Sequence, residues 1–289
     1  MLELIWDILW DAFFDTIKLV PFLFLTYLVM EWLEHKTGTR TQAAIRRAGK
    51  AGPLLGGVLG IFPQCGFSVA AANLYAGGLI TAGTLAAVFL STSDEMLPIF
   101  LSEAVSITSI VKILAMKMVL AVLSGFVLDF LYHKIIRKEI RYKNIHAMCE
   151  SEHCKCEEGI FQSALRHTLQ ITLFIFLITL ALNIIIAAIG EEQLASLLQN
   201  IPVAGEVVAA LIGLIPNCAA SVVITELYVQ GVIGAGPMMA GLLSSAGLGM
   251  LIMFRMNKKH PKHNFGILAF VYVAAVFWGI LIDMLGINF

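Results

Sequence analysis

Long apolar segments separated by short polar connections dominate the chain. The apolar runs cover residues 17–33, 54–90, 107–131, 168–189, 207–254 and 265–287. Several of them exceed the roughly 20 residues that a helix needs to cross the hydrocarbon core of a bilayer. Because lipid offers no hydrogen bonds to the backbone, these runs must be helical or shielded by protein. The pattern predicts an all-α polytopic membrane protein.

Composition agrees with this prediction. Apolar residues make up 59% of the 289 positions, charged residues make up 13%, and the mean hydropathy is +0.87. A soluble domain carries about 25% charged residues. We therefore expect the lipid bilayer to be the main partner, and the net charge of −1 gives no reason to expect a nucleic-acid partner.

Two of the longest apolar runs are interrupted by the same polar motif, GIFPQCGFS at 60–68 and GLIPNCAAS at 213–221. An offset of 153 residues pairs Pro63, Cys65 and Ser68 with Pro216, Cys218 and Ser221. Further matches occur before and after the motif at offsets of 152 to 154. We therefore divide the chain into a first transmembrane repeat at 1–132, a His/Cys-rich linker at 133–159 and a second transmembrane repeat at 160–289.

The placement of basic residues predicts the orientation of the repeats. Lys and Arg gather in the connections at 36–50, 134–166 and 255–262, which should therefore face the cytoplasm. Acidic residues without Lys or Arg lie at 3–11 and 191–206, as expected on the outer side. The connection after the first helix then lies inside in one repeat and outside in the other. The sequence predicts two inverted-topology repeats in the cell membrane, with both termini outside.

The segment 53–101 must begin inside and end outside, yet its 49 residues are too few for three full spans. We expect a re-entrant hairpin with arms at 53–62 and 67–78, followed by a spanning helix at 79–101 that is broken near STSDEMLP. Interrupted backbone at membrane depth requires protein or a water-filled cavity around it. Inverted repeats with broken helices are how secondary transporters commonly form a substrate site. The interruptions therefore predict a binding site.

Polar side chains near these breaks are the candidates for substrate binding, namely Gln64, Cys65, Ser68, Ser91, Ser93, Asp94, Glu95, Asn217, Cys218, Ser221, Glu226 and Ser244. Thiols and carboxylates within this set are candidate ligands of a transported metal: Cys65, Asp94, Glu95 and Cys218. Ionisable groups inside a membrane segment are costly, which favours a functional role. The alternatives are helix capping by the acids, packing by the cysteines, backbone satisfaction by the serines, and an interfacial position for Glu226.

Two further features carry ionisable or metal-binding groups. Lys117 lies within the apolar run 107–131 and is the best candidate for a buried counter-ion. The linker sequence HAMCESEHCKCEEG contains His146, Cys149, His153, Cys154 and Cys156. Thiolate and imidazole together suit zinc or copper, although the spacing matches no named zinc-finger pattern. A metal-handling loop and a solvated charged linker both remain open, and a disulfide framework is not expected in the cytoplasm.

The chain resembles the ten-TM heavy-metal exporter family, whose bacterial members are labelled arsenic efflux proteins or manganese transporters. The resemblance rests on FPQCGFS and STSDEMLPI in the first half and on IPNCAAS and SSAGLGMLI in the second, and it covers nearly the whole chain. It implies an efflux permease with two five-segment repeats. The second half has Gly247 and Leu248 where the first has Asp94 and Glu95, so the carboxylates are not repeated.

These observations predict a secondary active transporter, not an enzyme, that exports a heavy-metal or metalloid ion. The expected substrate is a divalent transition-metal cation such as Zn, Mn or Cu, with no permanently bound cofactor. The absence of GxxxxGK[ST] argues against an ATPase on this chain. An anion transporter is the alternative, and a lipid-acting membrane enzyme is a weaker one. Homo-oligomerisation is left open.

Overall fold

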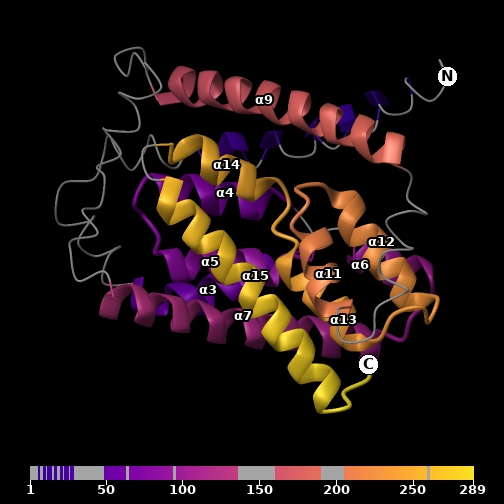
Figure 1. Cartoon of the computed structure of the whole chain (residues 1–289). Helices are drawn as coiled ribbons and strands as arrows, with labels where there is room; N and C mark the ends of the chain where they lie inside the picture. The colour runs from indigo at the N-terminus through magenta and orange to yellow at the C-terminus, as the bar shows by residue number, and fades with distance from the viewer. Residues whose placement is uncertain are drawn as a thin grey trace.

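The computed structural model describes residues 49–62, 65–93, 96–135, 160–189, 205–258 and 261–289, and scattered positions of an N-terminal helix between residues 6 and 28. Every regular element in these parts of the chain is a helix (Figure 1). Among the described residues, five helical stretches are long and apolar enough to cross a membrane, at Ala82–Ser102, Ile107–His133, Ala164–Ala181, Ala235–Met256 and Pro261–Met284. The predicted all-α membrane fold is confirmed.

The first half forms a series of short helices followed by one long helix. The elements are η1 (Gly49–Ala51), α3 (Gly52–Gly60), α4 (Cys65–Ala76), α5 (Ala82–Ser91), α6 (Met96–Ser102) and α7 (Ile107–Ile135). The two hairpin arms predicted at 53–62 and 67–78 agree with α3 and α4 to within three residues. The predicted broken helix at 79–101 agrees with α5 and α6.

The second half contains α9 (Ile160–Ile189), α11 (Gly205–Gly213), α12 (Cys218–Val229), α13 (Ala235–Ser244), α14 (Leu248–Met256) and α15 (Pro261–Met284). Its short helices have the lengths of their counterparts: α3 and α11 have 9 residues each, α4 and α12 have 12, and α5 and α13 have 10. All three pairs begin and end 153 residues apart. The two halves thus have equal helix bounds although their sequences share only part of their positions.

Helix packing follows the same order in the two halves. In the first half α3 packs on α5 and α5 on α7, while in the second α11 packs on α13 and α13 on α15. The two halves also pack against each other, and their contacts include α4 against α14 and α6 against α12 (Figure 1). Each half therefore completes its packing with a helix that belongs to the other half.

Asp129 of α7 and Asp283 of α15 accept hydrogen bonds from the N-terminal ends of α5 and α13. The carboxylate of Asp129 accepts hydrogen bonds from the Gly83 backbone N–H at 2.8 Å and from the Thr81 hydroxyl at 2.7 Å. In the second half, the carboxylate of Asp283 accepts a bond from the Gly236 backbone N–H at 2.9 Å. A negative group is favourable at the N-terminal end of a helix, where backbone N–H groups lack helical partners. These aspartates thus fix α5 and α13 against α7 and α15.

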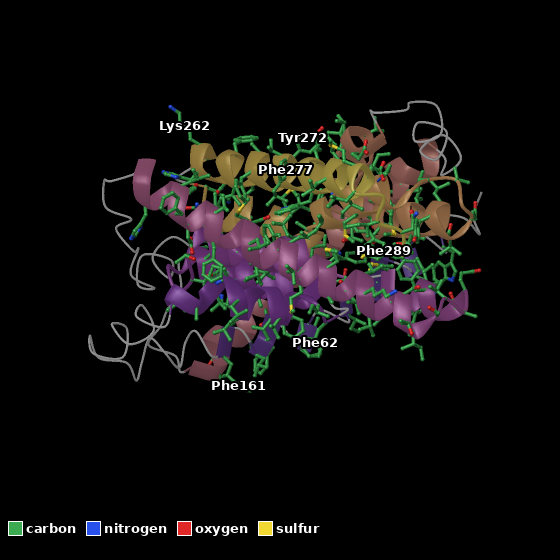
Figure 2. All side chains as sticks on the ribbon, turned by 90° about the horizontal axis from the view of Figure 1, so that it is seen from below. Phe62, Phe161, Lys262, Tyr272, Phe277 and Phe289 are labelled. Atoms are coloured by element: carbon green, nitrogen blue, oxygen red, sulfur yellow. The ribbon has the colours of Figure 1, made fainter. Side chains whose placement is uncertain are left out.

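The long outer helices present apolar side chains at the surface. Phe161 on α9 is 64% exposed and Phe277 on α15 is 56% exposed, and Figure 2 shows both at the periphery of the molecule. Phe62, which follows α3 in the chain, is also exposed. Exposed aromatic and aliphatic side chains on long helices are what a lipid-facing surface requires. The surface therefore supports the membrane assignment independently of the sequence pattern.

The long helices α7 and α15 meet at matching positions of the two halves. The indole N–H of Trp278 donates a 2.8 Å hydrogen bond to the hydroxyl of Ser124. These residues are 154 apart, which is the offset that the sequence gives for this part of the two halves. Residues at equivalent positions of two related halves contact each other only where both lie close to the axis that relates the halves. The contact is the arrangement expected of two related halves, and their inverted orientation stays a prediction.

A tag-accessibility experiment tests the inverted orientation. We expect tags near Gly190 and at Phe289 to be accessible from outside the cell, because the acidic connections lie there. Tags near Arg47, Glu152 and Lys259 should be accessible from the cytoplasm only, because basic connections are retained inside. If tags near Gly190 and Lys259 were accessible from the same side, the inverted arrangement would be wrong.

Candidate functional site

Both long helical stretches that contain α5 and α13 are broken in the middle of the molecule. Helix α5 ends at Ser91, and its C-cap Thr92 has a ψ of 130°, which turns the chain away before α6 begins at Met96. Helix α13 ends at Ser244, and Gly247 precedes α14 with a φ of 54°. A φ in this region favours glycine because a Cβ would be strained there. Gly247 is the counterpart of Asp94 at the offset of 153, so the two breaks differ at this position.

Lys117 links the two breaks. It lies on α7, has no exposed surface, and its ammonium donates hydrogen bonds to the backbone oxygens of Thr92 and, at 3.0 Å, Leu242. Both acceptors lie at the C-terminal ends of broken helices, α5 and α13. Burying an ammonium is costly unless acceptors replace its water. The buried charge that the sequence suggested therefore sits between the helix ends of the two halves.

The buried serines of the predicted site donate their hydroxyl hydrogens to backbone oxygens. Ser91 donates to Ala87 at 2.8 Å, Ser93 to Ser91 at 3.0 Å, Ser221 to Cys218 at 2.8 Å, and Ser244 to Gly241 at 2.9 Å. A hydroxyl that donates in this way keeps oxygen lone pairs that can accept a hydrogen bond or contact a cation. These serines thus satisfy backbone groups at the breaks and still offer oxygen ligands.

The short helices α3 and α11 closely approach the broken helices at Ser91 and Ser244. A Cβ on Gly60 would overlap the Ser91 hydroxyl, and a Cβ on Gly213 would overlap the Ser244 hydroxyl. Helix α3 therefore approaches α5, and α11 approaches α13, at matched positions. The Ser91 and Ser244 hydroxyls face these hairpin arms.

The motif helices α4 and α12 begin at the two repeated cysteines. Asn217 is the N-cap of α12, and its side-chain oxygen accepts a hydrogen bond from the Ala219 backbone N–H at 3.2 Å. Cys218 is half-buried at the first position of the helix. Ser68 of α4 is fully buried against α14, since a Cβ on Gly249 would lie 2.6 Å from the Ser68 backbone oxygen.

The helix of the second motif, α12, lies close to the break between α5 and α6 of the first half. Helix α12 packs against α6, where the rings of Phe100 and Tyr228 meet at a centroid separation of 6.2 Å. Helix α6 begins directly after Glu95 in the chain. The predicted ligands Gln64, Asp94 and Glu95, and the side chain of Cys65, lie outside the described residues.

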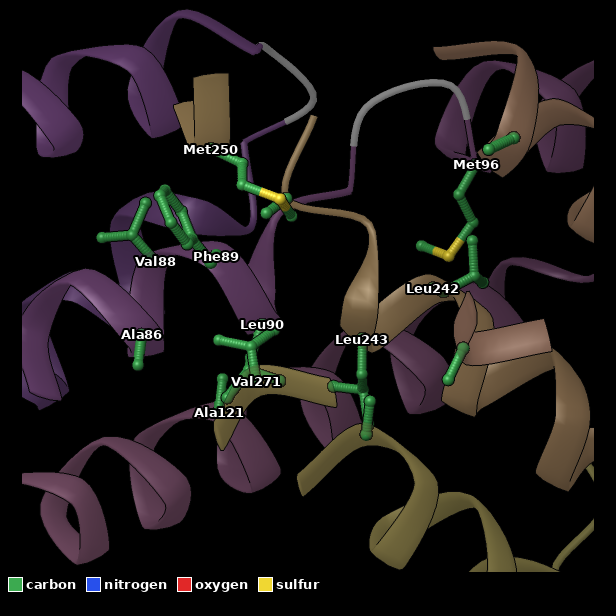
Figure 3. Packing of buried hydrophobic residues seen from close by; sticks show 14 of the residues in the cluster. Ala86, Val88, Phe89, Leu90, Met96, Ala121, Leu242, Leu243, Met250 and Val271 are labelled. Atoms are coloured by element: carbon green, nitrogen blue, oxygen red, sulfur yellow. The ribbon is translucent and has the colours of Figure 1, made fainter. Parts of the chain in front are cut away.

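The core around the breaks is apolar. Figure 3 shows Met96, Leu242, Leu243 and Leu90 gathered from the two broken helices, beside Val271 of α15. All five side chains are at most 1% exposed. The polar groups at the breaks are therefore enclosed by a buried apolar shell, in which charges interact more strongly than in water.

Glu226 differs from the other predicted site residues because it is exposed on α12. Its counterpart Asn73 on α4 is fully buried and accepts a 3.1 Å hydrogen bond from the Tyr27 hydroxyl. The two positions thus have different surroundings in the two halves. The structure does not place Glu226 among the buried polar side chains at the breaks.

The described residues contain no group of three or more His, Cys, Asp or Glu side chains that could hold a metal ion. The predicted linker ligands His146, Cys149, His153, Cys154 and Cys156 all lie outside those residues.

Comparison with known proteins identifies the family. A family model described as "Putative, 10TM heavy-metal exporter" matches residues 1–189 and also residues 155–288. Together the two matches cover nearly the whole chain. The chain belongs to this exporter family. Neither the curated proteins nor the solved structures give a match.

Membership of the ten-TM heavy-metal exporter family confirms the resemblance drawn from the two motifs. The described helices supply five segments in each half when each hairpin arm counts as one and each broken helix counts as one. In the first half these are the N-terminal helix, α3, α4, α5 with α6, and α7. In the second they are α9, α11, α12, α13 with α14, and α15.

Proposed function

We propose that this member of the heavy-metal exporter family is a secondary active transporter that exports a divalent transition-metal cation, with a proton or other ion gradient as the driving force. The family description favours a transporter over the lipid-acting enzyme. The cation would bind between the two helix breaks, in the dry centre of the molecule.

The observation that carries this proposal is that helices of one half pack against the helices that follow the break in the other half. The second motif helix, α12, packs on α6, which follows the first break, and the first motif helix, α4, packs on α14, which follows the second break. Residues from both halves therefore surround each break. This arrangement supports one shared site, and a site shared by two related halves is suited to alternating access by movement of one half against the other.

Each ligand type has a distinct role in the proposed site. Asp94 and Glu95 would supply negative charge that offsets the cation, and Cys65 and Cys218 would supply thiolates, which select soft metals. Hydroxyl and amide oxygens, including those of Ser221 and Asn217, would complete the coordination shell. Metal binding to thiols releases their protons. Protons could then return through the same site after the metal has left, which couples export to a proton gradient.

Transport into inverted membrane vesicles tests the proposal, because export from a cell becomes uptake into such vesicles. With an acidic lumen and no ATP, we expect uptake of Zn²⁺ and Cd²⁺ to exceed uptake of Mn²⁺, and uptake should stop when the pH gradient is collapsed. Vesicles that contain the protein but accumulate none of these metals beyond empty vesicles would contradict the proposal.

An anion transporter is the second candidate, and Lys117 is the observation that favours it. The ammonium is fully buried between the two breaks. Helices α4 and α12, which pack against the helices that follow the breaks, have N-terminal ends that attract negative groups. An arsenite-derived or organic oxyanion would be the substrate, and arsenate serves as a stable oxyanion probe. Gradient-driven uptake of arsenate that is unchanged by loss of the Asp94 carboxylate would favour this candidate over the cation exporter.

A further inference from the structure

We infer that the C-terminal ends of α5 and α13 together form a binding site for a small monovalent cation, and that Lys117 fills this site permanently with its own ammonium group. This inference concerns a second position beside the transported ion, and it holds whether the substrate is a cation or an anion. It makes Lys117 a tethered ion between the two halves.

The acceptors of this site are carbonyls that the helix breaks set free. The Ala246 backbone N–H, which would reach the Leu242 oxygen in a continuous helix, bonds instead to the Ser244 oxygen at 2.8 Å. Thr92 is the C-cap of α5, and its ψ of 130° carries the chain out of the helical path. The Thr92 and Leu242 oxygens therefore turn to the Lys117 ammonium.

Electrostatics at this point favour a cation. The C-terminal end of a helix carries partial negative charge on its unpaired carbonyls, and here two such ends meet in one dry place. In transporters with broken helices, carbonyls of this kind commonly hold the coupling Na⁺ or proton. The Lys117 ammonium has the charge of such an ion and donates hydrogen bonds to the same type of acceptor.

The site holds one lysine although the halves are related. At the offset of 154, the counterpart of Lys117 is Val271 on α15, which is 1% exposed. Figure 3 shows Val271 beside Leu90 and Leu243, which lie in the last turns of α5 and α13. A second lysine there would place two ammonium groups among the same helix ends. The single ammonium of Lys117 therefore donates hydrogen bonds to the helix ends of both halves.

A lysine cannot leave with the substrate, so the two helix ends stay linked while the rest of each half moves. The protein would then need no free Na⁺ at this position. Removing the side chain should open the site to an ion from solution and make the protein depend on that ion.

The test uses a Lys117→Ala variant of the full chain and n-propylammonium, which replaces the atoms removed beyond Cβ. We expect the variant to lose about 10 °C in Tm in detergent, since loss of one partner leaves buried acceptors without a donor. Propylammonium should restore at least half of the loss, and 1-propanol, a neutral molecule of the same size, should not. Vesicle transport by the variant should recover with propylammonium in the same way.

Two control variants separate charge from packing. Ile113→Ala removes an equally buried side chain one turn earlier on α7, and propylammonium should not raise its Tm. Lys117→Met keeps the volume without the charge and should remain at least about 5 °C less stable than the parent. The inference would be overturned if propanol rescued Lys117→Ala as well as propylammonium, if Ile113→Ala were rescued equally, or if Lys117→Met matched the parent in Tm and transport.

Discussion

An Asp94→Asn variant is expected to export Zn²⁺ at less than about 1% of the parental rate, a loss equivalent to at least about 2.7 kcal/mol of activation free energy. The cation would enter a dry centre that already holds the buried ammonium of Lys117. Holding a divalent ion there without sufficient negative charge is expensive, and Asn keeps the shape of Asp while removing its charge. The measurement is initial Zn²⁺ uptake into inverted vesicles at matched protein levels.

The matched control for this change is Glu103→Gln. Glu103 is exposed in the turn that follows α6, and the substitution removes the same charge at a similar position along the chain. We expect it to retain parental transport within about twofold. Parental Zn²⁺ transport by Asp94→Asn would leave Asp94 as a helix cap for α6 and would contradict the proposed ligand role.

Combined replacement of Cys65 and Cys218 by Ser should change selectivity more than it changes the amount of folded protein. Thiolates favour Zn²⁺, Cd²⁺ and copper, whereas hydroxyl oxygens suit harder ions such as Mn²⁺. We expect the ratio of Zn²⁺ to Mn²⁺ transport to fall by about tenfold, or about 1.4 kcal/mol. Competition between the two metals in the same vesicles measures this ratio.

The linker cysteines provide a control of identical chemistry in a separate part of the sequence. Replacing Cys149, Cys154 and Cys156 by Ser should weaken metal capture at low concentration and leave both the maximal rate and the metal preference unchanged. An unchanged Zn²⁺ to Mn²⁺ ratio in the Cys65 and Cys218 variant would instead assign those two cysteines to packing.

Helix bounds were predictable because local chemistry determines them. Proline, glycine and short polar stretches ended the apolar runs, and the predicted arms at 53–62 and 67–78 differ from α3 and α4 by at most three residues. The repeat reinforced each assignment, since the same break signal appeared at matched positions. The all-α membrane class followed from composition and run length alone.

The partners of the polar residues were less predictable. Lys117 stood out because it is a charge in an apolar run, yet nothing in the sequence indicates that the Thr92 and Leu242 carbonyls receive it. Backbone acceptors have no residue signature and become available only where a helix ends. The contrast between exposed Glu226 and buried Asn73 was equally hidden, because matched positions in two halves can pack against different neighbours.

The role of the serines also required the structure. Repetition of Ser91 and Ser244 at matched positions is typical of both ligands and packing residues. The hydrogen bonds to Ala87 and Gly241 show that the hydroxyls satisfy backbone oxygens. Their lone pairs remain available, so these serines are secondary ligands in our account, and the carboxylate and thiols carry most of the expected effect.

Protection of Cys65 and Cys218 from a thiol reagent tests the central claim most directly, because that claim places both thiols on one transported metal. The protein would carry Ser at the three linker cysteines, and alkylation of each remaining thiol by N-ethylmaleimide would be timed with and without Zn²⁺. We expect Zn²⁺ to slow both reactions at least about tenfold, and the Asp94→Asn change to remove this protection. Equal alkylation rates with and without Zn²⁺ at both cysteines would contradict the metal site between the helix breaks.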